Sequence, residues 1–297
     1  MNPGIYQNIS FAEYNALPYL RNSYLKKLSI CPASAQIETN GTTTALTIGR
    51  ASHALILEGE AAFNKEFMVA PADAPKKPTS AQINAKKPSA AAMHSIQWWN
   101  QFNTLAHGKE IISAEDCAML QGMDRAVKTH PFAKTLLAEG VSEQTVVADI
   151  EVDGEMIRCK SRPDRTPSTK MACMIDLKSC ADASYRGFLN ACYRFSYFHQ
   201  AADYIECYNS ALEVMINEHG WSREENPPMD AFVFIAIEKE PPYRCEVYTL
   251  QGDNNLLIQG REDFYMNLRT EVQCRKQGFY PHYLDAGAQE LLPFNER

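Results

Sequence analysis

The stretch Met174–Cys180, "MIDLKSC", decides the fold of this chain. Its apolar residues predict a β-strand, and alternate side chains of a strand project from the same face of a sheet. Asp176 and Lys178 therefore share one face. Taken alone, the pair is explained by a surface ion pair on an edge strand. The functional interpretation is a metal ligand beside a lysine that orients water, and the surrounding sequence has to decide between the two.

A second carboxylate comes from the preceding segment Glu155–Asp164, "EMIRCKSRPD". Four of its side chains share one strand face: Arg158, Lys160, Arg162 and Asp164. Without further context this is the solvent-exposed face of a half-buried hairpin. It leads, however, to a carboxylate at the strand end, where Pro163 stops the ladder. Two carboxylates that converge can hold a hard divalent cation such as Mg²⁺, and the carbonyl oxygen of Leu177 would complete the ligand set.

Such a metal lowers the pKa of a bound water and polarises a phosphoryl oxygen, while a neighbouring lysine stabilises negative charge. These are the parts that phosphodiester hydrolysis needs. The arrangement of the remaining elements is consistent with an enzyme core. Residues 1–140 are predicted to be mainly helical, with a loop over 71–90 that is expected to be mobile because it is rich in Pro, Lys and Ala. Residues 141–297 begin with a hairpin around Asp153-Gly154 and continue as strands and helices, which predicts an α/β fold with a mixed central sheet.

Composition bounds the function. The chain has 297 residues, 45% hydrophobic and 22% charged, which describes a globular protein able to bury a core. No basic, apolar leader opens the sequence, and no apolar run is long enough for a membrane span, so a cytoplasmic protein without membrane contact is expected. A net charge of −7 argues against non-specific coating of nucleic acid, but it leaves room for a local basic groove. The nine scattered cysteines contain no Cys-x-x-Cys and are expected to be reduced thiols.

The pattern "RPD…MIDLK" resembles the signature of the PD-(D/E)XK nucleases. Two further segments resemble motifs of the RecB-type branch, in the expected order: "GRASHALILE" (Gly49–Glu58) and "HQAADY" (His199–Tyr204). Segments near both ends, "GIYQNISFAEYNALPYLRNSYLKKLSICPAS" and "REDFYMNLRTEVQCRKQGFYPHY", are similar to the nuclease domain of the RecE (exonuclease VIII) family. The resemblance covers nearly the whole chain, so residues 1–297 are expected to form a single domain of this type.

The resemblance implies the site residues. His53, Asp164 and Asp176 would be metal ligands with the Leu177 carbonyl, and Lys178 would be the catalytic lysine. Gln200 and Tyr204, one helical turn apart, would line the site or contact DNA. Glu58 lies about 140° around an α-helix from His53, so it is expected to have a structural or supporting role. Further DNA contacts are expected from basic residues on the same face or nearby: Arg50, Arg158, Lys160 and Arg162.

The resemblance also implies a Mg²⁺-dependent exonuclease, with Mn²⁺ as a substitute metal, acting 5′-to-3′ on ends of double-stranded DNA. It further implies a toroidal homotetramer of bacterial or phage origin that works with a single-strand annealing protein in recombination. No iron–sulfur cluster is expected, because only Cys245 and Cys274 lie late in the chain, too far apart to form part of a clustered trio. Two alternatives remain open: a structure-specific or restriction-type DNA endonuclease, and a non-catalytic DNA-binding subunit on the same fold.

Overall fold

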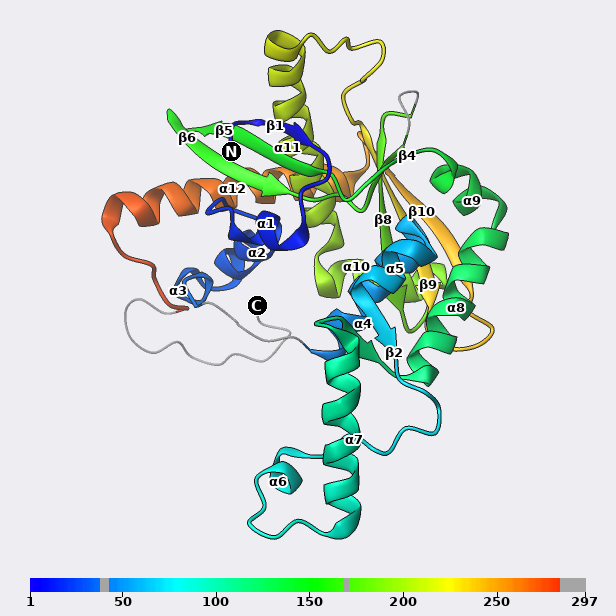
Figure 1. The fold of residues 1–297 in the computed structure, drawn as a ribbon. Helices are drawn as coiled ribbons and strands as arrows, with labels where there is room; N and C mark the ends of the chain where they lie inside the picture. Colours follow the sequence, from blue (N-terminus) through cyan, green and yellow to red (C-terminus); the bar gives the residue numbers. More distant parts are fainter. Residues whose placement is uncertain (38–42, 168–170, 284–297) are drawn as a thin grey trace, which may run out of the picture.

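The computed structural model describes residues 1–37, 43–167 and 171–283. Its described strands form three sheets: a five-stranded sheet in the order β10-β9-β8-β7-β4, a three-stranded sheet in the order β1-β5-β6, and the parallel pair β2-β3. Helices pack around the two larger sheets (Figure 1). The mixed α/β architecture predicted from the sequence, with helices flanking a central mixed sheet, is confirmed.

The strands are β1 (Gly4–Tyr6), β2 (Phe67–Val69), β3 (Glu110–Ile112), β4 (Gly140–Ser142), β5 (Thr145–Val152), β6 (Glu155–Ser161), β7 (Arg165–Pro167), β8 (Cys173–Cys180), β9 (Ala231–Glu238) and β10 (Cys245–Gln251). The helices of the first half are α1 (Phe11–Ala16), α2 (Asn22–Ile30), α3 (Pro32–Ala35), α4 (Thr44–His53), α5 (Glu60–Glu66), α6 (Ser80–Ile83) and α7 (Ala90–Ala106). Those of the second half are α8 (Ala114–Thr129), α9 (Pro131–Ala138), α10 (Tyr185–Phe195), α11 (Tyr197–His219) and α12 (Asn255–Gln277). A π-helical segment, η1 (Ala54–Glu58), continues α4.

The centre of the larger sheet is buried on both faces. Strand β8 pairs with β9 in parallel, and β9 pairs with β10 antiparallel. Along β9, Phe232 and Phe234 belong to one hydrophobic core, whereas Val233 and Ile235 belong to the other. A strand covered on both faces has no polar side to expose, which is why "AFVFIAI" is an uninterrupted apolar run.

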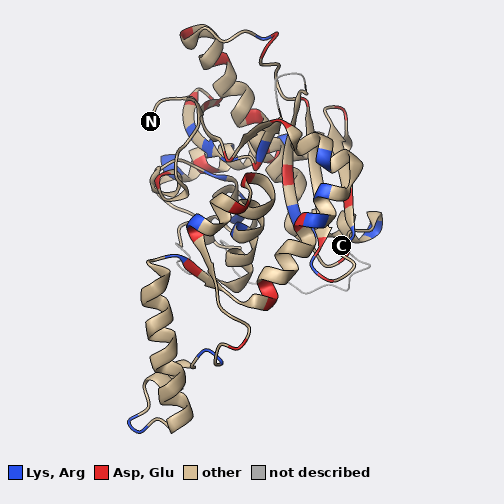
Figure 2. Cartoon of the chain, turned by 45° about the vertical axis from the view of Figure 1, so that its right-hand side comes forward, with Lys and Arg blue, Asp and Glu red and all other residues tan. Residues whose placement is uncertain are grey.

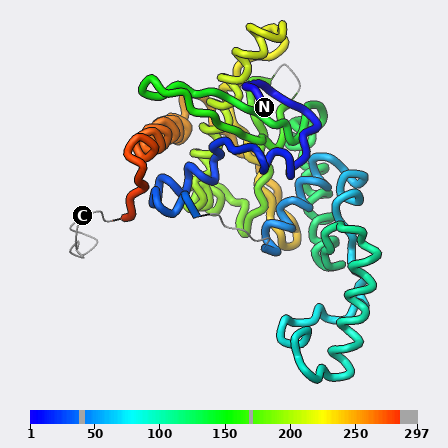
Figure 3. Tube along the Cα trace, turned by 60° about the vertical axis from the view of Figure 1, so that its left-hand side comes forward, coloured from blue at the N-terminus to red at the C-terminus, as the bar shows by residue number. Residues whose placement is uncertain are grey.

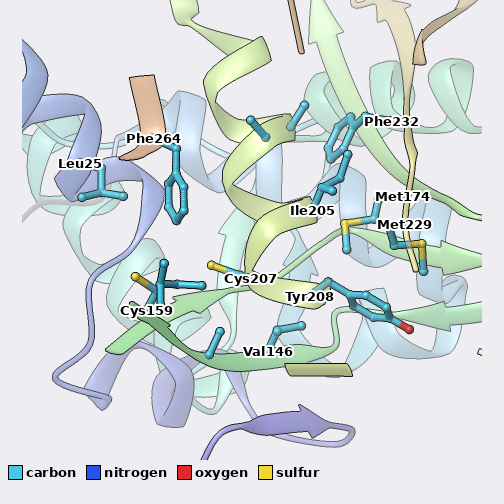
Figure 4. Close-up of a cluster of buried hydrophobic side chains, with 14 of the residues drawn as sticks. Leu25, Val146, Cys159, Met174, Ile205, Cys207, Tyr208, Met229, Phe232 and Phe264 are labelled. Carbon is cyan, nitrogen blue, oxygen red and sulfur yellow. The ribbon is translucent and has the colours of Figure 1, made fainter. Parts of the chain in front are cut away.

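The two cores lie on opposite faces of this sheet. The first core fills the space between β8–β9, the three-stranded sheet and helix α11, with Ile205, Cys207 and Tyr208 projecting from α11 among residues of the strands (Figure 4). The second core lies beneath α4, η1, α8 and α9. Met174 of β8 packs in the first core, so Asp176 and Lys178, two and four residues further on, share the face of β8 that looks toward α11.

The predicted hairpin is confirmed but belongs to a separate sheet. Strands β5 and β6 pair over their full length around Asp153 and Gly154, which both have positive φ as a two-residue hairpin turn requires. The chain then leaves β6 and enters the five-stranded sheet as β7, and the connection from β4 to β5 makes the reverse crossing. The short strands β1, β3 and β7 were missed by the sequence prediction, since three residues are too few to show alternation.

A projection separates β2 from β3. Helices α6 and α7 extend away from the body of the molecule (Figures 1 and 3). The segment 71–90, expected to be a loop, contains the one-turn helix α6, and the backbone of Pro75 and Lys76 is hydrogen-bonded to side chains of α7. Its mobility stays a prediction. No helix in the described part of the chain combines the length and apolar character that a membrane crossing requires.

Two helical glycines give a matched test of the packing. A Cβ on Gly260 of α12 would lie 2.4 Å from the carbonyl oxygen of Phe198 on α11, whereas one on Gly49 of α4 would meet nothing within 4 Å. Alanine in a helix interior is normally favoured over glycine by up to about 1 kcal/mol. We therefore expect Gly49→Ala to raise the free energy of unfolding by up to this amount. Gly260→Ala should lower it by about 1–3 kcal/mol, because the helices must move apart. Denaturant unfolding of both variants checks this; equal effects would contradict the α11–α12 contact.

Candidate active site

Asp164 joins the two sheets at the centre of the site. It stands between β6 and β7, and its Oδ2 accepts a hydrogen bond of 2.7 Å from the backbone N–H of Leu177 in β8. Asp164 is therefore fixed beside Asp176, the neighbour of Leu177, and both carboxylates are buried. Burial, together with the nearby Asp176 carboxylate, raises the pKa of Asp164 to about 7. The convergence of two carboxylates is the arrangement the sequence predicted.

His53, the last residue of α4, faces these carboxylates. Its Nε2 lies 3.5 Å from Asp164 Oδ2, and its Nδ1 lies 3.4 Å from Glu143 Oε1. Burial by itself would lower the pKa of His53, but the two carboxylates outweigh it and raise the pKa to about 9. In the absence of a cation, the imidazolium takes over the role of countercharge.

Glu143 is a member of the site that the sequence reasoning missed. Oxygen or nitrogen atoms of His53, Glu143 and Asp164 lie within 4.8 Å of one another, close enough for one metal ion. Burial would raise the pKa of Glu143, but His53 and Arg162 outweigh it and lower the pKa. The residue has φ of 55°, uncommon for a non-glycine residue. Its backbone N–H donates to the carbonyl of Asp164 at 3.1 Å. No sequence motif marks it, because it lies in the short β4–β5 crossing.

Asp176, Lys178 and Gln200 form a second group beside the first. Gln200 of α11 donates from Nε2 to Asp176 Oδ1 at 2.8 Å and accepts from Lys178 Nζ at 2.9 Å. Lys178 Nζ also lies 2.7 Å from Asp176 Oδ2, without the direction of a hydrogen bond. Burial would lower the pKa of Lys178, but the Asp176 and Asp164 carboxylates raise it, so the ammonium stays charged. The two charges of "MIDLKSC" are thus an inward pair held in place by an amide.

The site opens into a cleft of about 690 Å³. Predicted residues from five places in the sequence line it: Gly49 and Arg50, His53, Arg162 and Asp164, Lys178, and Gln200 and Tyr204. Arg162 donates to Glu143 Oε2 at 2.7 Å and to the carbonyl of Ile9, which brings the N-terminal segment to the rim. Gly49 has no side chain to narrow the cleft.

Glu58 also lines this cleft, contrary to the direction expected from α-helical spacing. The expected angle of about 140° assumed that the α-helix continues beyond His53. Residues Ala54–Glu58 are instead π-helical, with i to i+5 hydrogen bonding that brings residues five apart toward the same side. Burial, followed by the Glu143 and Glu66 carboxylates, raises the pKa of Glu58. Its position makes it a further acidic group at the cleft.

The predicted DNA-contacting face of β6 is corrected at two positions. Lys160 is only 2% exposed, and its ammonium donates to the carbonyls of Tyr14, Asn15 and Leu17 at the end of α1, so a DNA contact by Lys160 is wrong. Its charge caps a helix C-terminus, where cations are favourable. Arg158 lies outside the cleft lining and makes a bidentate ion pair with Asp149 on the neighbouring strand β5. Only Arg162 of the three reaches the cleft.

The residues fit a hard divalent cation. Asp164 and Glu143 supply carboxylate oxygens and His53 a ring nitrogen, all converging on one point. Both Asp164 and Asp176 are buried carboxylates, and Asp176 Oδ2 has no hydrogen-bond donor among the described residues. Such groups are normally satisfied by hydrogen bonds or a metal. The roles of Asp176 and of the Leu177 carbonyl as ligands stay predictions.

This arrangement, an Asp between two strands, an Asp-x-Lys strand in a mixed sheet and a histidine helix opposite, defines the PD-(D/E)XK nuclease superfamily. Residues 22–292 match the model of one of its families, described as a PDDEXK-like domain of unknown function (DUF3799), and the chain belongs to that family. None of the curated proteins matches the chain.

Two solved structures are similar to the chain. One, from Eubacterium rectale and named "Putative exonuclease", is 14% identical, covers 98% of each chain and gives a TM-score of 0.56. At this identity the likeness shows a shared fold. A phage related exonuclease from Haemophilus somnus is 12% identical, covers 77% of this chain and 95% of its own, and gives a TM-score of 0.31.

The pKa values of the ligands predict how metal affinity depends on pH. A metal bound by neutral His53 and ionised Asp164 must displace a proton from His53 below about pH 9 and a second from Asp164 below about pH 7. The apparent affinity for Mn²⁺ should therefore rise with pH, about tenfold per unit from 7 to 9 and more steeply below 7. Titration calorimetry in buffers of different ionisation enthalpy measures affinity and released protons together. A pH-independent affinity would contradict this ligand set.

The assignment of Glu143 can be tested by one substitution. We expect Glu143→Gln to weaken Mn²⁺ binding by at least about tenfold, since it removes a charged ligand while keeping the shape of the side chain. Glu151→Gln, which neutralises an exposed carboxylate on β5, is the matched control and should bind metal as the unmodified chain does. Thermal shift with increasing Mn²⁺ gives the readout. Equal shifts for both variants would remove Glu143 from the site.

Proposed function

We propose that this protein is a Mg²⁺-dependent exodeoxyribonuclease that degrades linear double-stranded DNA, as the resemblance to the RecE family implies. The observation that carries the proposal is the convergence, in one open cleft, of Asp164 and His53 with the Asp176–Lys178 pair. A scaffold has no use for a charged lysine held against two buried carboxylates. The same arrangement favours hydrolysis over a purely DNA-binding subunit.

Each group has a role in that reaction. His53, Glu143 and Asp164, with Asp176 and the Leu177 carbonyl, would hold the metal, which when bound supplies charge to a phosphoryl oxygen and acidity to a water. Lys178 is placed to orient the attacking water or to stabilise negative charge on the phosphate. Gln200 bridges Lys178 and Asp176 and so fixes the direction of the ammonium. Arg50, Arg162 and Tyr204 line the same cleft and are positioned to contact the phosphate backbone.

Wider features of the proposal rest on the resemblance. The names of the two similar structures both contain the word exonuclease, which is consistent with action at DNA ends. The 5′-to-3′ polarity, a ring-shaped homotetramer, a single-strand annealing partner and a cytoplasmic role in phage-type recombination belong to this proposal. An endonuclease on the same fold is the second candidate, and closed circular duplex separates the two.

The direct test is digestion of linear duplex labelled separately at each 5′ and 3′ end. With Mg²⁺, label at the 5′ end should be released as short product before the 3′ label, and EDTA should stop the release. Asp176→Asn and Lys178→Met should each lower the rate by at least about a hundredfold, because metal binding and charge stabilisation are lost. Asp149→Asn, which alters an acid outside the cleft, is the control. Cleavage of closed circles would contradict the exonuclease, and full activity of Asp176→Asn would contradict the site.

A further inference from the structure

The segment Pro71–Lys109, called the arm below, has a charge opposite to that of the rest of the chain. It contains five lysines and one acidic residue, Asp73, and so carries +4 in a protein of net charge −7. The rest of the chain therefore carries −11. Figure 2 shows the arm projecting from the body with basic positions at its tip and along its side. We propose that the arm is a second DNA-binding element, which holds the phosphate backbone of the duplex outside the cleft; this inference rests on the proposed function.

The root of the arm is attached to the wall of the active site. The arm leaves β2 and returns through β3, and these two strands pair in parallel. Glu110, the first residue of β3, accepts a hydrogen bond of 3.0 Å from Thr47 of α4 and forms an ion pair with Arg50 of the same helix. His53 ends that helix, one turn beyond Arg50. The arm therefore has a fixed connection to the helix that carries the metal-site histidine.

The basic segment is held in a defined place on α7. Ser95 donates to the carbonyl of Lys76 at 2.6 Å, and the indole of Trp99 donates to the carbonyl of Pro75 at 2.8 Å. The Lys77 ammonium lies over the Trp99 ring, 5.7 Å from its centroid. These contacts fix the backbone next to the lysines while leaving the ammonium groups at the surface. A solvated linker would need none of them.

The arm's lysines lack acidic partners. Among the residues that the structure describes, none of Lys76, Lys77, Lys86 and Lys87 forms an ion pair with a carboxylate. Elsewhere, by contrast, Lys128 pairs with Asp124 and Lys276 with Glu155. Four uncompensated positive charges on a projection favour a polyanion as partner, because each phosphate contact releases condensed counterions.

The dimensions suit a duplex that extends from the cleft. Helix α7 has 17 residues, which at 1.5 Å per residue gives a length of about 26 Å. With a rise of 3.4 Å per base pair, this length corresponds to about seven or eight base pairs. A duplex whose end lies at Asp164 and Lys178 would thus have its next turn within reach of the arm. Such a contact contributes affinity without sequence specificity, as an exonuclease requires.

The experiment compares two quadruple variants. In the arm variant, Lys76, Lys77, Lys86 and Lys87 are each changed to Gln. The control variant makes the same change in net charge by substituting four exposed lysines of the body: Lys128, Lys134, Lys239 and Lys276. Binding to a labelled blunt duplex of about 30 base pairs is measured by anisotropy in EDTA over a salt series, so that cleavage does not interfere.

We expect the arm variant to bind at least about tenfold more weakly at low salt, with the slope of log affinity against log salt reduced by about 3 to 4, roughly 0.9 for each lost phosphate contact. The control variant should match the unmodified chain. With Mg²⁺, the arm variant should still degrade a hairpin of about six base pairs, too short to reach past the cleft, at the unmodified rate. It should degrade the long duplex more slowly.

The outcomes separate this inference from the proposed function. If the unmodified chain binds duplex with the expected arm effect but releases no labelled product, the nuclease proposal fails and the arm proposal stands. If the chain degrades DNA while the arm and control variants show equal affinity and equal salt slope, the arm proposal is overturned. Exposed Ile83, Met93 and Leu105 lie on the arm as well. A changed mass by light scattering with unchanged DNA binding would show that the arm contacts protein instead, and this also overturns the proposal.

Discussion

The buried hydrogen bond from the Leu177 N–H to Asp164 is the contact on which this site depends. It joins the segment between β6 and β7 to the middle of β8, and it brings a second carboxylate beside Asp176 in a place that excludes water. Two such charges are unfavourable together unless cations accompany them. His53 and Lys178 provide these cations from α4 and from β8 itself. The helices above the sheet are thus held over it by charge as well as by apolar contact.

The crossings between the two sheets explain why Glu143 and Asp164 meet. Ser142 pairs with Arg165 in one sheet and Val146 with Ser161 in the other, so the intervening residues of both segments run side by side. Residues in such crossings are released from the alternation of a strand and can both turn toward one point. Glu143 takes a left-handed conformation there, which is unfavourable by about 1–2 kcal/mol for a non-glycine residue. The Arg162 ion pair and the backbone bond to Asp164 offset that strain.

The sequence predicted what depends on strand alternation and on local motifs. The paired directions of Asp176 and Lys178, the Asp-Gly hairpin, the buried β9 and the separate histidine helix all follow from such short-range rules. Lys160 shows the limit, because strand parity indicates a face but not what covers it, and here helix α1 covers it. Glu58 and Glu143 show a second limit. Their directions are set by a π-helical segment and by a sheet crossing, which have no pattern of their own in one sequence.

The pairing of β2 with β3 has a consequence for how this domain can change over evolution. Because the two strands lie in parallel register, with Phe67 opposite Glu110, the chain enters and leaves the arm at neighbouring points. The cost of closing a longer or shorter insertion between fixed neighbouring ends grows only slowly with its length. The nuclease core and its projection can therefore diverge at different rates. Members of this family can exchange or resize the segment between these strands while the residues of the cleft keep their positions.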